Sequence, residues 1–226
     1  MLHKETVSRE MWDLLQKLMS DEKLNNFTLV GGTALSLRIG HRLSVDIDLF
    51  TARDFDAEKL LVYLRETYGA SDSKTFNNTV LTYIDDIKVD LLKHDYQNVV
   101  PPDTRDGIRL ASKEDIGAMK LHAIFQSGDR LKDFVDMYFL LDHAPLKNYL
   151  DAYERKYNGS PDLAKYALTY FDNIRREYNV SILKGKECSW DTMAQRLRKA
   201  AMDPKMDFAK RRLPLKTKPP KRGRGL

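Results

Sequence analysis

Asp46 and Asp48 stand two residues apart and alternate with apolar side chains in the stretch 44–50, a pattern that predicts a β-strand. In a strand, such residues point to the same face, so the two carboxylates would lie close together. Close carboxylates repel each other unless a cation lies between them or one is protonated. Hard divalent cations such as Mg²⁺ bind such sites and complete their coordination with water and phosphate. The pair therefore predicts a metal site, and a solvent-facing strand with two polar positions is the alternative.

A Gly31-Gly32-Thr33 turn follows the apolar stretch 27–30 and precedes a short helical pattern. Glycine has no Cβ, so the backbone can approach a phosphate closely. The N–H groups at the start of a helix lack partners within the helix and favour an anion. Thr33 adds a hydroxyl donor. The turn would suit a cradle for a phosphate, but taken alone it is better interpreted as an ordinary strand-to-helix turn.

A third acid, Asp90, stands among β-forming residues in the stretch 87–92. If this strand lies beside 44–50, Asp90 completes a site of three carboxylates. Three acids around two Mg²⁺ ions suit phosphoryl or nucleotidyl transfer. One ion would lower the pKa of the attacking hydroxyl, and the other would hold the triphosphate and the leaving pyrophosphate. Asp85 and Asp86 are interpreted as turn residues.

Together these features resemble the nucleotidyltransferase superfamily with the polymerase-β-like core. Its pattern is an apolar strand, Gly-Gly or Gly-Ser, a short helix, Asp-x-Asp and a later acid among apolar residues. The positions that match it are Gly31, Gly32, Asp46, Asp48 and Asp90. The stretches 41–50, 112–123 and 132–140 also look like the AbiEii branch, the bacterial abortive-infection and toxin–antitoxin nucleotidyltransferases. The resemblance covers residues 27–142.

The AbiEii resemblance implies an active-site lysine at Lys120 and an active-site acid at either Asp133 or Asp136. The ammonium group would neutralise charge on the triphosphate, and the carboxylate would orient the lysine or accept a proton. Arg42 and Ser44 lie near the carboxylates and are candidates for contact with phosphate or ribose. The resemblance also implies a toxin-like role, an RNA acceptor such as a tRNA 3′ end, and a partner antitoxin.

The helices and strands that would position these residues divide the chain into two parts. They are an α/β core at 1–111 and a helical domain at 112–204. The predicted fold class is α+β, with a mixed sheet and flanking helices. Strands are predicted at 27–30, 44–50, 79–84, 87–92 and 107–110. Helices are predicted at 7–19, 33–39, 57–68, 112–126, 131–141, 146–157, 162–178 and 190–202. Gly40 is expected to end its helix in a left-handed conformation. Ser112 and Asp115 are expected to cap the helix that follows them.

The net charge of +5 is concentrated at the C-terminal end of the chain. Residues 205–226 hold nine Lys or Arg and one Asp, a net of +8, which leaves −3 for residues 1–204. Because this segment is rich in Pro and Gly, we expect a flexible basic tail. Its charge would suit nucleic acid, and a solvated terminus is the alternative.

Composition narrows the class of protein. The 226-residue chain is 42% hydrophobic and 31% charged, as is typical of a globular protein. No apolar run approaches the roughly 18 residues of a membrane span, and the start of the sequence lacks a signal-peptide pattern. The single cysteine, Cys188, excludes an internal disulfide and fits a reducing cytosol. We therefore expect a cytoplasmic protein with no membrane partner.

Two other functions stay open from the sequence. The same core would also suit transfer of a nucleotide to a small molecule or to a protein. A non-catalytic module that binds a nucleotide or RNA is the second alternative, and the complete set of acids argues against it. Tyr166, Tyr170 and Tyr178 would suit base stacking, but packing into the core is the preferred interpretation.

Overall fold

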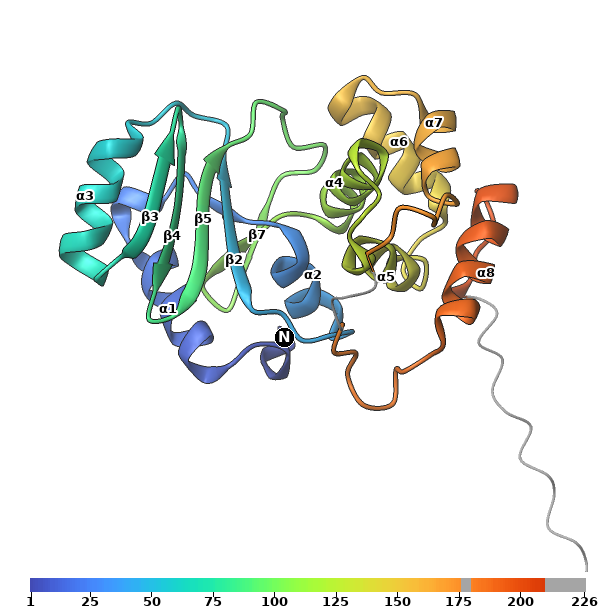
Figure 1. Cartoon of the computed structure of the whole chain (residues 1–226), viewed down its shortest axis with the longest axis horizontal. Helices are drawn as coiled ribbons and strands as arrows, with labels where there is room; N and C mark the ends of the chain where they lie inside the picture. Colours follow the sequence, from blue (N-terminus) through green and yellow to red (C-terminus); the bar gives the residue numbers. More distant parts are fainter. Residues whose placement is uncertain (176–179, 210–226) are drawn as a thin grey trace, which may run out of the picture.

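In the computed structural model, which describes residues 1–175 and 180–209, a mixed seven-stranded sheet leads into a group of helices (Figure 1). The strand order is β3-β4-β5-β2-β1-β7-β6. The strands are β1 (Thr28–Leu29), β2 (Asp46–Thr51), β3 (Ser71–Phe76), β4 (Thr79–Ile84), β5 (Ile87–Lys93), β6 (Asp103–Arg105) and β7 (Ile108–Leu110). The predicted α+β fold with a mixed sheet and flanking helices is confirmed.

Three α-helices belong to the sheet half of the chain: α1 (Arg9–Ser20), α2 (Gly31–Ile39) and α3 (Ala57–Tyr68). Short 3-10 turns flank α1 at Lys4–Thr6 and Glu22–Leu24. The helical half consists of α4 (Lys113–Gln126), α5 (Leu131–Leu140), α6 (Leu146–Tyr157), α7 (Pro161–Ala167) and α8 (Trp190–Met202). None of the helices within 1–175 and 180–209 is long and apolar enough to cross a bilayer.

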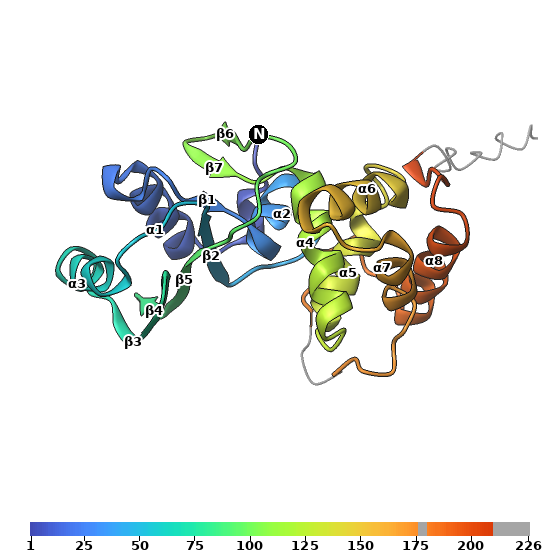
Figure 2. The ribbon, with the colours of Figure 1, turned by 90° about the horizontal axis from the view of Figure 1, so that it is seen from above.

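Alternation along β2 gives the sheet two chemically different faces. Ile47 and Leu49 are fully buried, whereas Asp46, Asp48 and Phe50 keep part of their surface exposed. Figure 2 shows α1 and α3 on one side of the sheet and α2, α4 and α5 on the other. Because α1 and α3 bury apolar side chains such as Leu15 and Leu64, the apolar face packs under them. The carboxylate face is thereby turned toward the helical half.

Local capping explains where two of the predicted helices begin or end. Gly40 ends α2 with φ 61°, in the left-handed conformation expected for it. Ser112 caps α4 by accepting a hydrogen bond from the N–H of Asp115. The Asp115 carboxylate does not complete a capping box in return. It accepts hydrogen bonds from the Ser112 hydroxyl and from the N–H groups of Val99 and Val100, so it fixes the loop after β5 to the start of α4.

The predicted helix 162–178 is wrong over residues 168–175, because α7 ends at Ala167. The chain then turns, and the Arg175 N–H donates to the carbonyl of Asp129, 2.9 Å away. This tertiary bond draws the segment to the loop before α5 and is incompatible with continued helix. Predicted core packing is also wrong for Tyr166 and Tyr170, which are 68% and 43% exposed. Residue 178 lies outside the described residues.

Three other differences concern strands. The strand predicted at 44–50 begins only at Asp46, and Val45 is 72% exposed. The strands β3 and β6 were not predicted, because their sequences Ser71–Phe76 and Asp103–Arg105 are polar edge segments without a strong strand pattern.

One connected set of buried apolar residues runs through both halves, from Leu2 to Ala200. The predicted boundary at 111/112 falls between β7 and α4, and the division into two domains stays a prediction. Of the predicted basic tail, residues 210–226 lie outside the described residues.

Candidate active site

The parallel pairing of β2 with β5 places the three predicted acids together. The register sets Asp48 directly opposite Asp90, and Asp46 opposite Lys88. Asp46 shares the face of Asp48 because it is two residues away on the same strand. Burial, followed by the negative charge of Asp90, raises the pKa of the Asp48 carboxyl. The carboxylates are therefore close enough to repel each other.

Lysine side chains neutralise two of these acids. Lys132 Nζ lies 3.4 Å from Asp46 Oδ2, and Lys88 Nζ is hydrogen-bonded to Asp90 Oδ2. Burial alone would lower the pKa of Lys88, but its hydrogen bond to Asp90 raises it. The other Asp90 oxygen, Oδ1, is buried and has no hydrogen-bond partner among the described residues. Sequence reasoning had not identified Lys88 or Lys132 as site residues.

The carboxylate oxygens form a donor set that suits a hard divalent cation. A buried oxygen without a partner, Asp90 Oδ1, is the kind of atom that an ion would satisfy. In the described part of the chain, however, no three His, Cys, Asp or Glu side chains lie where they would hold a metal ion together. The chemistry of the donor atoms therefore suits a metal ion, and binding one would require the carboxylates to reorient.

The glycine turn lies beside these acids. Helix α2 begins at Gly31, and its N-cap residue Val30 supplies no capping side chain. Gly31 has φ +68°, and a Cβ there would lie 2.5 Å from Asp48 Oδ2. A Cβ on Gly32 would collide with the guanidinium group of Arg42. The two glycines therefore allow Asp48 and Arg42 to approach the start of α2, where uncapped N–H groups favour an anion.

Thr33 and Ser44 are both buried, and they connect α2 to β2. The Thr33 hydroxyl lies within hydrogen-bonding distance of the Asp46 carbonyl oxygen and 2.8 Å from Ser44 Oγ. A hydroxyl has one proton, so these internal acceptors occupy it. Both side chains thus hold the helix start against the strand that carries Asp46, and the Thr33 proton is already used within the protein.

Asp136 on α5 is the centre of a buried ionic network. It lies 2.7 Å from His41 Nε2 and accepts a hydrogen bond of 2.6 Å from Arg42 Nε. Lys120 Nζ on α4 lies 2.7 Å from its second oxygen. Burial alone would raise the pKa of Asp136, but the charges of Arg42 and Lys120 hold it well below its usual value. Asp136 therefore stays ionised and joins α4, α5 and the loop that follows α2.

Lys120 is buried between two carboxylates. Its ammonium group donates to Asp133 Oδ1 at 2.7 Å and also contacts Asp136. Burial would lower the pKa of Lys120, but the two acids raise it, so the side chain stays charged. Its charge in turn lowers the pKa of Asp48, after the larger opposing effects of burial and Asp90. Both predicted acids thus hold the predicted lysine near the carboxylate cluster.

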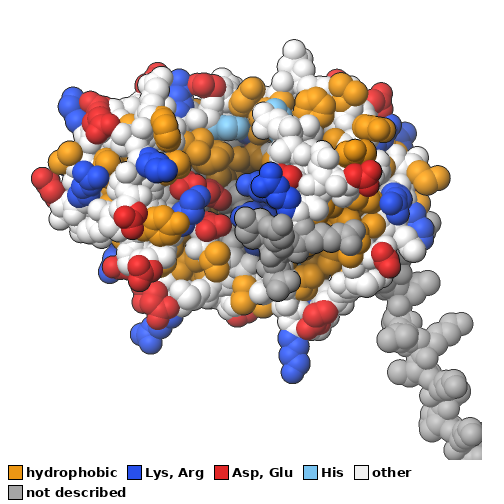
Figure 3. All heavy atoms as spheres, in the orientation of Figure 1, with side chains coloured by type: hydrophobic (Ala, Val, Ile, Leu, Met, Phe, Trp, Pro, Cys, Tyr) orange, Lys and Arg blue, Asp and Glu red, His pale blue; other side chains and the backbone are white. Residues whose placement is uncertain are grey.

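Arg130, at the N-cap of α5, also belongs to this arrangement and was missed from the sequence. Its Nε donates to Asp133 Oδ2 at 2.8 Å, and about half of its side chain is exposed. Counted together, the site has five basic side chains (Arg42, Lys88, Lys120, Arg130, Lys132) and five acidic ones (Asp46, Asp48, Asp90, Asp133, Asp136). Its acidic and basic side chains are therefore equal in number before any ligand binds. Figure 3 shows acidic and basic side chains gathered in the hollow between the two halves.

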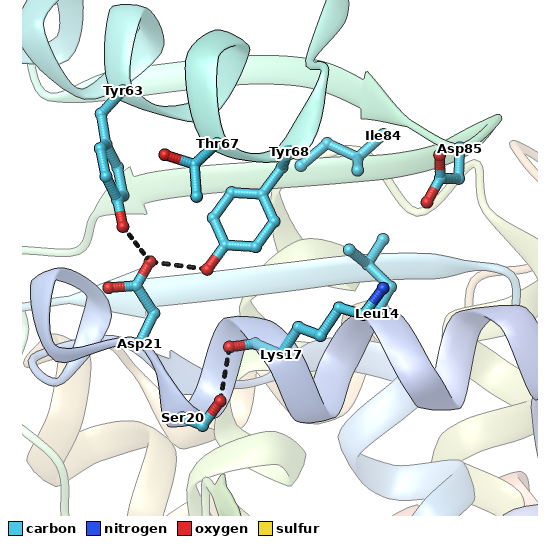
Figure 4. Close-up of a pocket in the computed structure, with 9 residues that line it drawn as sticks. All are labelled: Leu14, Lys17, Ser20, Asp21, Tyr63, Thr67, Tyr68, Ile84 and Asp85. Atoms are coloured by element: carbon cyan, nitrogen blue, oxygen red, sulfur yellow. Dashed lines mark hydrogen bonds between the residues drawn. The ribbon is translucent and has the colours of Figure 1, made fainter.

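A separate cavity of about 530 Å³ lies between α1, α3 and the β4–β5 turn (Figure 4). There the Asp21 carboxylate accepts hydrogen bonds of 2.7 Å from the hydroxyls of Tyr63 and Tyr68. None of the predicted site residues lines this cavity. It lies on the side of the sheet covered by α1 and α3, and it does not belong to the carboxylate site.

Comparisons with known proteins find relatives along most of the chain. The model of the family described as "Nucleotidyl transferase AbiEii toxin, Type IV TA system" matches residues 13–219. A curated relative is the uncharacterized protein aq_aa25 of Aquifex aeolicus (strain VF5). It is 33% identical over 184 residues, which cover 76% of this chain and 86% of that protein.

Solved structures share the fold at lower sequence identity. JHP933 from Helicobacter pylori is 20% identical with a TM-score of 0.54, over 88% of this chain and 89% of JHP933. The antibiotic-resistance factor ANT(2'')-Ia is 17% identical with a TM-score of 0.50, over 64% of this chain and 89% of that factor. At these identities the similarity extends to the fold alone.

Proposed function

The chain belongs to the AbiEii family of nucleotidyltransferase toxins of Type IV toxin–antitoxin systems, and we propose that it carries out magnesium-dependent transfer of a nucleoside monophosphate from a nucleoside triphosphate to a hydroxyl of RNA. The observation that carries this proposal is the register that sets Asp48 beside Asp90, with Gly31 directly against Asp48. A tRNA 3′ end is the proposed acceptor, and an antitoxin protein is the proposed partner.

The chain's own residues have distinct roles in this proposal. The uncapped start of α2, at Gly31 and Gly32, binds the triphosphate. Thr33 and Ser44 hold that helix start against β2. Arg42 and Lys120 add positive charge beside the phosphates, and Asp133 and Asp136 position Lys120. The acceptor hydroxyl loses its proton to solvent as its oxygen forms a bond to the α-phosphorus, the bond from this phosphorus to the β-phosphate oxygen breaks, and pyrophosphate leaves.

Asp46, Asp48 and Asp90 would hold Mg²⁺. When bound, Mg²⁺ supplies positive charge for the triphosphate and lowers the pKa of the acceptor hydroxyl. The balance of charges at the site supports a need for such cations. Because the five basic side chains are already matched by five acidic ones, a triphosphate would add negative charge that the chain does not neutralise by itself.

An RNA acceptor is supported by basic side chains at the open edge of the site. Arg130, Lys132 and Lys88 each keep roughly half of their side chains exposed. They would offer cationic contacts to RNA phosphates at this edge. The basic segment 205–226, with a net charge of +8, would supply the attraction for a polyanion.

The test is a transfer assay with total RNA and each of the four nucleoside triphosphates, labelled at the α-phosphate. We expect label in RNA with Mg²⁺, and none after chelation with EDTA. Asp48→Asn should reduce incorporation by about 10²–10³-fold, while the surface variant Asp13→Asn on α1 should behave like the wild type. Equal incorporation by the wild type and Asp48→Asn would rule out the proposed mechanism, and label in a protein or a small molecule alone would rule out the RNA acceptor.

A further inference from the structure

A group of partly exposed rings lies on the same sheet face as the carboxylates. We define the aromatic platform as Phe50, His94, Tyr96, His122 and Tyr157, none of which is fully buried. Phe50 follows Asp48 by two residues on β2, so it points to the same face about 7 Å further along the strand. The carboxylate site therefore continues directly into an aromatic surface.

The platform joins the sheet half to the helical half. Phe50 stacks on His94, with ring centroids 5.4 Å apart and an interplanar angle of 29°. On the helical side, His122 of α4 stacks on Tyr157 of α6 at 4.0 Å and 5°. Tyr96 contacts both sides, because its ring lies 5.1 Å from His94 and 4.6 Å from Tyr157. Rings from three separate parts of the chain thus share one patch.

The loop that carries Tyr96 is held in place by a buried ion pair. Lys156 Nζ lies 2.8 Å from Asp115 Oδ1 and donates to the Gln97 carbonyl at 3.0 Å. The Asp115 carboxylate also binds the N–H groups of Val99 and Val100. Tyr96 itself is 42% exposed. A rigidly anchored loop that presents an exposed ring fits a preorganised contact surface better than incidental exposure.

Hydrogen-bonding atoms accompany the rings. His122 Nδ1 is buried without a partner among the described residues. His94 Nε2 and the Tyr157 hydroxyl lie 3.3 Å apart and bind each other. Aromatic rings with little charge are suited to stacking on a nucleobase, and these rings lie next to a site that would bind phosphate.

We propose that the aromatic platform stacks a nucleobase of the transfer reaction, either the base of the triphosphate or that of the acceptor's terminal nucleotide. This inference rests on the proposed function, because it needs the adjacent site to bind a nucleotide. It adds a base-binding surface, centred on Tyr96, to a site otherwise described by its phosphate and metal contacts.

Titration calorimetry on the full chain with Mg²⁺ tests the inference with three probes. The first probe is a nucleoside triphosphate, with each of the four tested in turn. The second is inorganic tripolyphosphate, which has no base, and the third is a short single-stranded oligoribonucleotide. Tyr96→Ala should weaken binding of the base-bearing probe that uses the platform by about 5- to 150-fold. It should leave tripolyphosphate binding unchanged. Tyr96→Phe keeps the ring and should bind like the wild type.

Tyr170→Ala is the matched control, since Tyr170 is 43% exposed and stacks on Tyr166 instead. A loss confined to the triphosphates assigns the platform to the incoming base, and a loss confined to the oligoribonucleotide assigns it to the acceptor. The Tyr96→Ala variant must melt like the wild type, as measured by circular dichroism. If this folded variant binds the triphosphates and the oligoribonucleotide as tightly as the wild type does, the result overturns this inference alone. An equal loss for tripolyphosphate would indicate a structural role and would also overturn it. If the wild type binds no probe, the proposed function falls as well.

Discussion

At Gly31 the absence of one carbon atom decides where a carboxylate can lie. The residue combines a left-handed φ of +68° with the close approach of Asp48 Oδ2, so a side chain would meet both strain and a collision. The glycine turn and the same-face aspartates were predictable, because residue type and a period of two specify them. The lysine partners of Asp46 and Asp90 were not, because ion pairing depends on which side chains the tertiary fold brings together.

Gly31→Ala should lower the free energy of unfolding by about 1–3 kcal/mol through backbone strain, with an additional loss from the displaced Asp48. Gly69→Ala is the matched control. Gly69 has φ +70°, and no heavy atom lies within 4 Å of the position that a Cβ would take, so the substitution there meets strain without collision. Urea denaturation of both variants measures the difference. Equal losses would contradict the close approach of Asp48 to α2.

Asp48→Asn should reduce nucleotidyl transfer by about 10²–10³-fold, because it removes a charge that the proposed metal requires. The same variant should unfold at the same temperature as the wild type or a higher one. Burial and Asp90 raise the pKa of Asp48, so its ionised form is disfavoured in the folded state and a neutral amide relieves that repulsion. Rates and thermal melts of one preparation test both parts. A lower melting temperature would contradict the repulsion.

At the scale of elements, the buried network around Asp136 joins α4, α5 and the loop after α2. The sequence resemblance indicated Lys120 and two candidate acids, and the structure gives both acids a contact with that lysine. The sequence pattern predicted α4, α5 and α6 well, and their bounds in the structure differ from the predicted ones by no more than one residue. It extended α7 too far, since the Arg175–Asp129 backbone bond is a tertiary contact that no local pattern encodes.

Asp136→Ala should destabilise the protein by about 3–5 kcal/mol, because it leaves the buried Arg42 and Lys120 charges without their shared partner. The matched control is Asp151→Ala on α6. Asp151 pairs with Lys147 at 2.7 Å, but both side chains are about half exposed, so the loss there should stay below about 1 kcal/mol. Chemical denaturation compares the two variants. A loss at Asp136 no larger than that at Asp151 would show that the network is dispensable.

At the scale of the whole molecule, the two halves share buried surface and the aromatic platform. Residues 1–111 and 112–204 were predicted as separate domains from a change in local pattern, which carries no information on how tightly the halves pack. The connected core from Leu2 to Ala200 leads us to expect one cooperative transition in calorimetry. We also expect the fragment 1–111 to fail to fold alone. Two resolved transitions, or a folded fragment, would favour independent domains.

His94 should make the stability of the whole protein depend on pH. Burial and the positive charge of Lys156 lower the pKa of His94 to about 4, below its unfolded value of about 6.5. The folded state therefore binds fewer protons between these values, and stability falls as pH drops from about 6.5 to 4. Because His94 is partly exposed, we expect about 1 kcal/mol of this loss between pH 7 and pH 5. His94→Gln should reduce the difference in free energy of unfolding between pH 7 and pH 5, as measured by denaturation curves. An unchanged difference would exclude His94 as its cause.

Lys88 and Lys132 give the acidic cluster counterions that belong to the chain itself. A polypeptide leaving the ribosome can therefore reach its native shape without waiting for a metal. Under the proposed mechanism, removal of magnesium would stop nucleotidyl transfer and leave the folded protein unchanged. The proposed need for the ion would then be measurable in turnover and hardly at all in a melting curve.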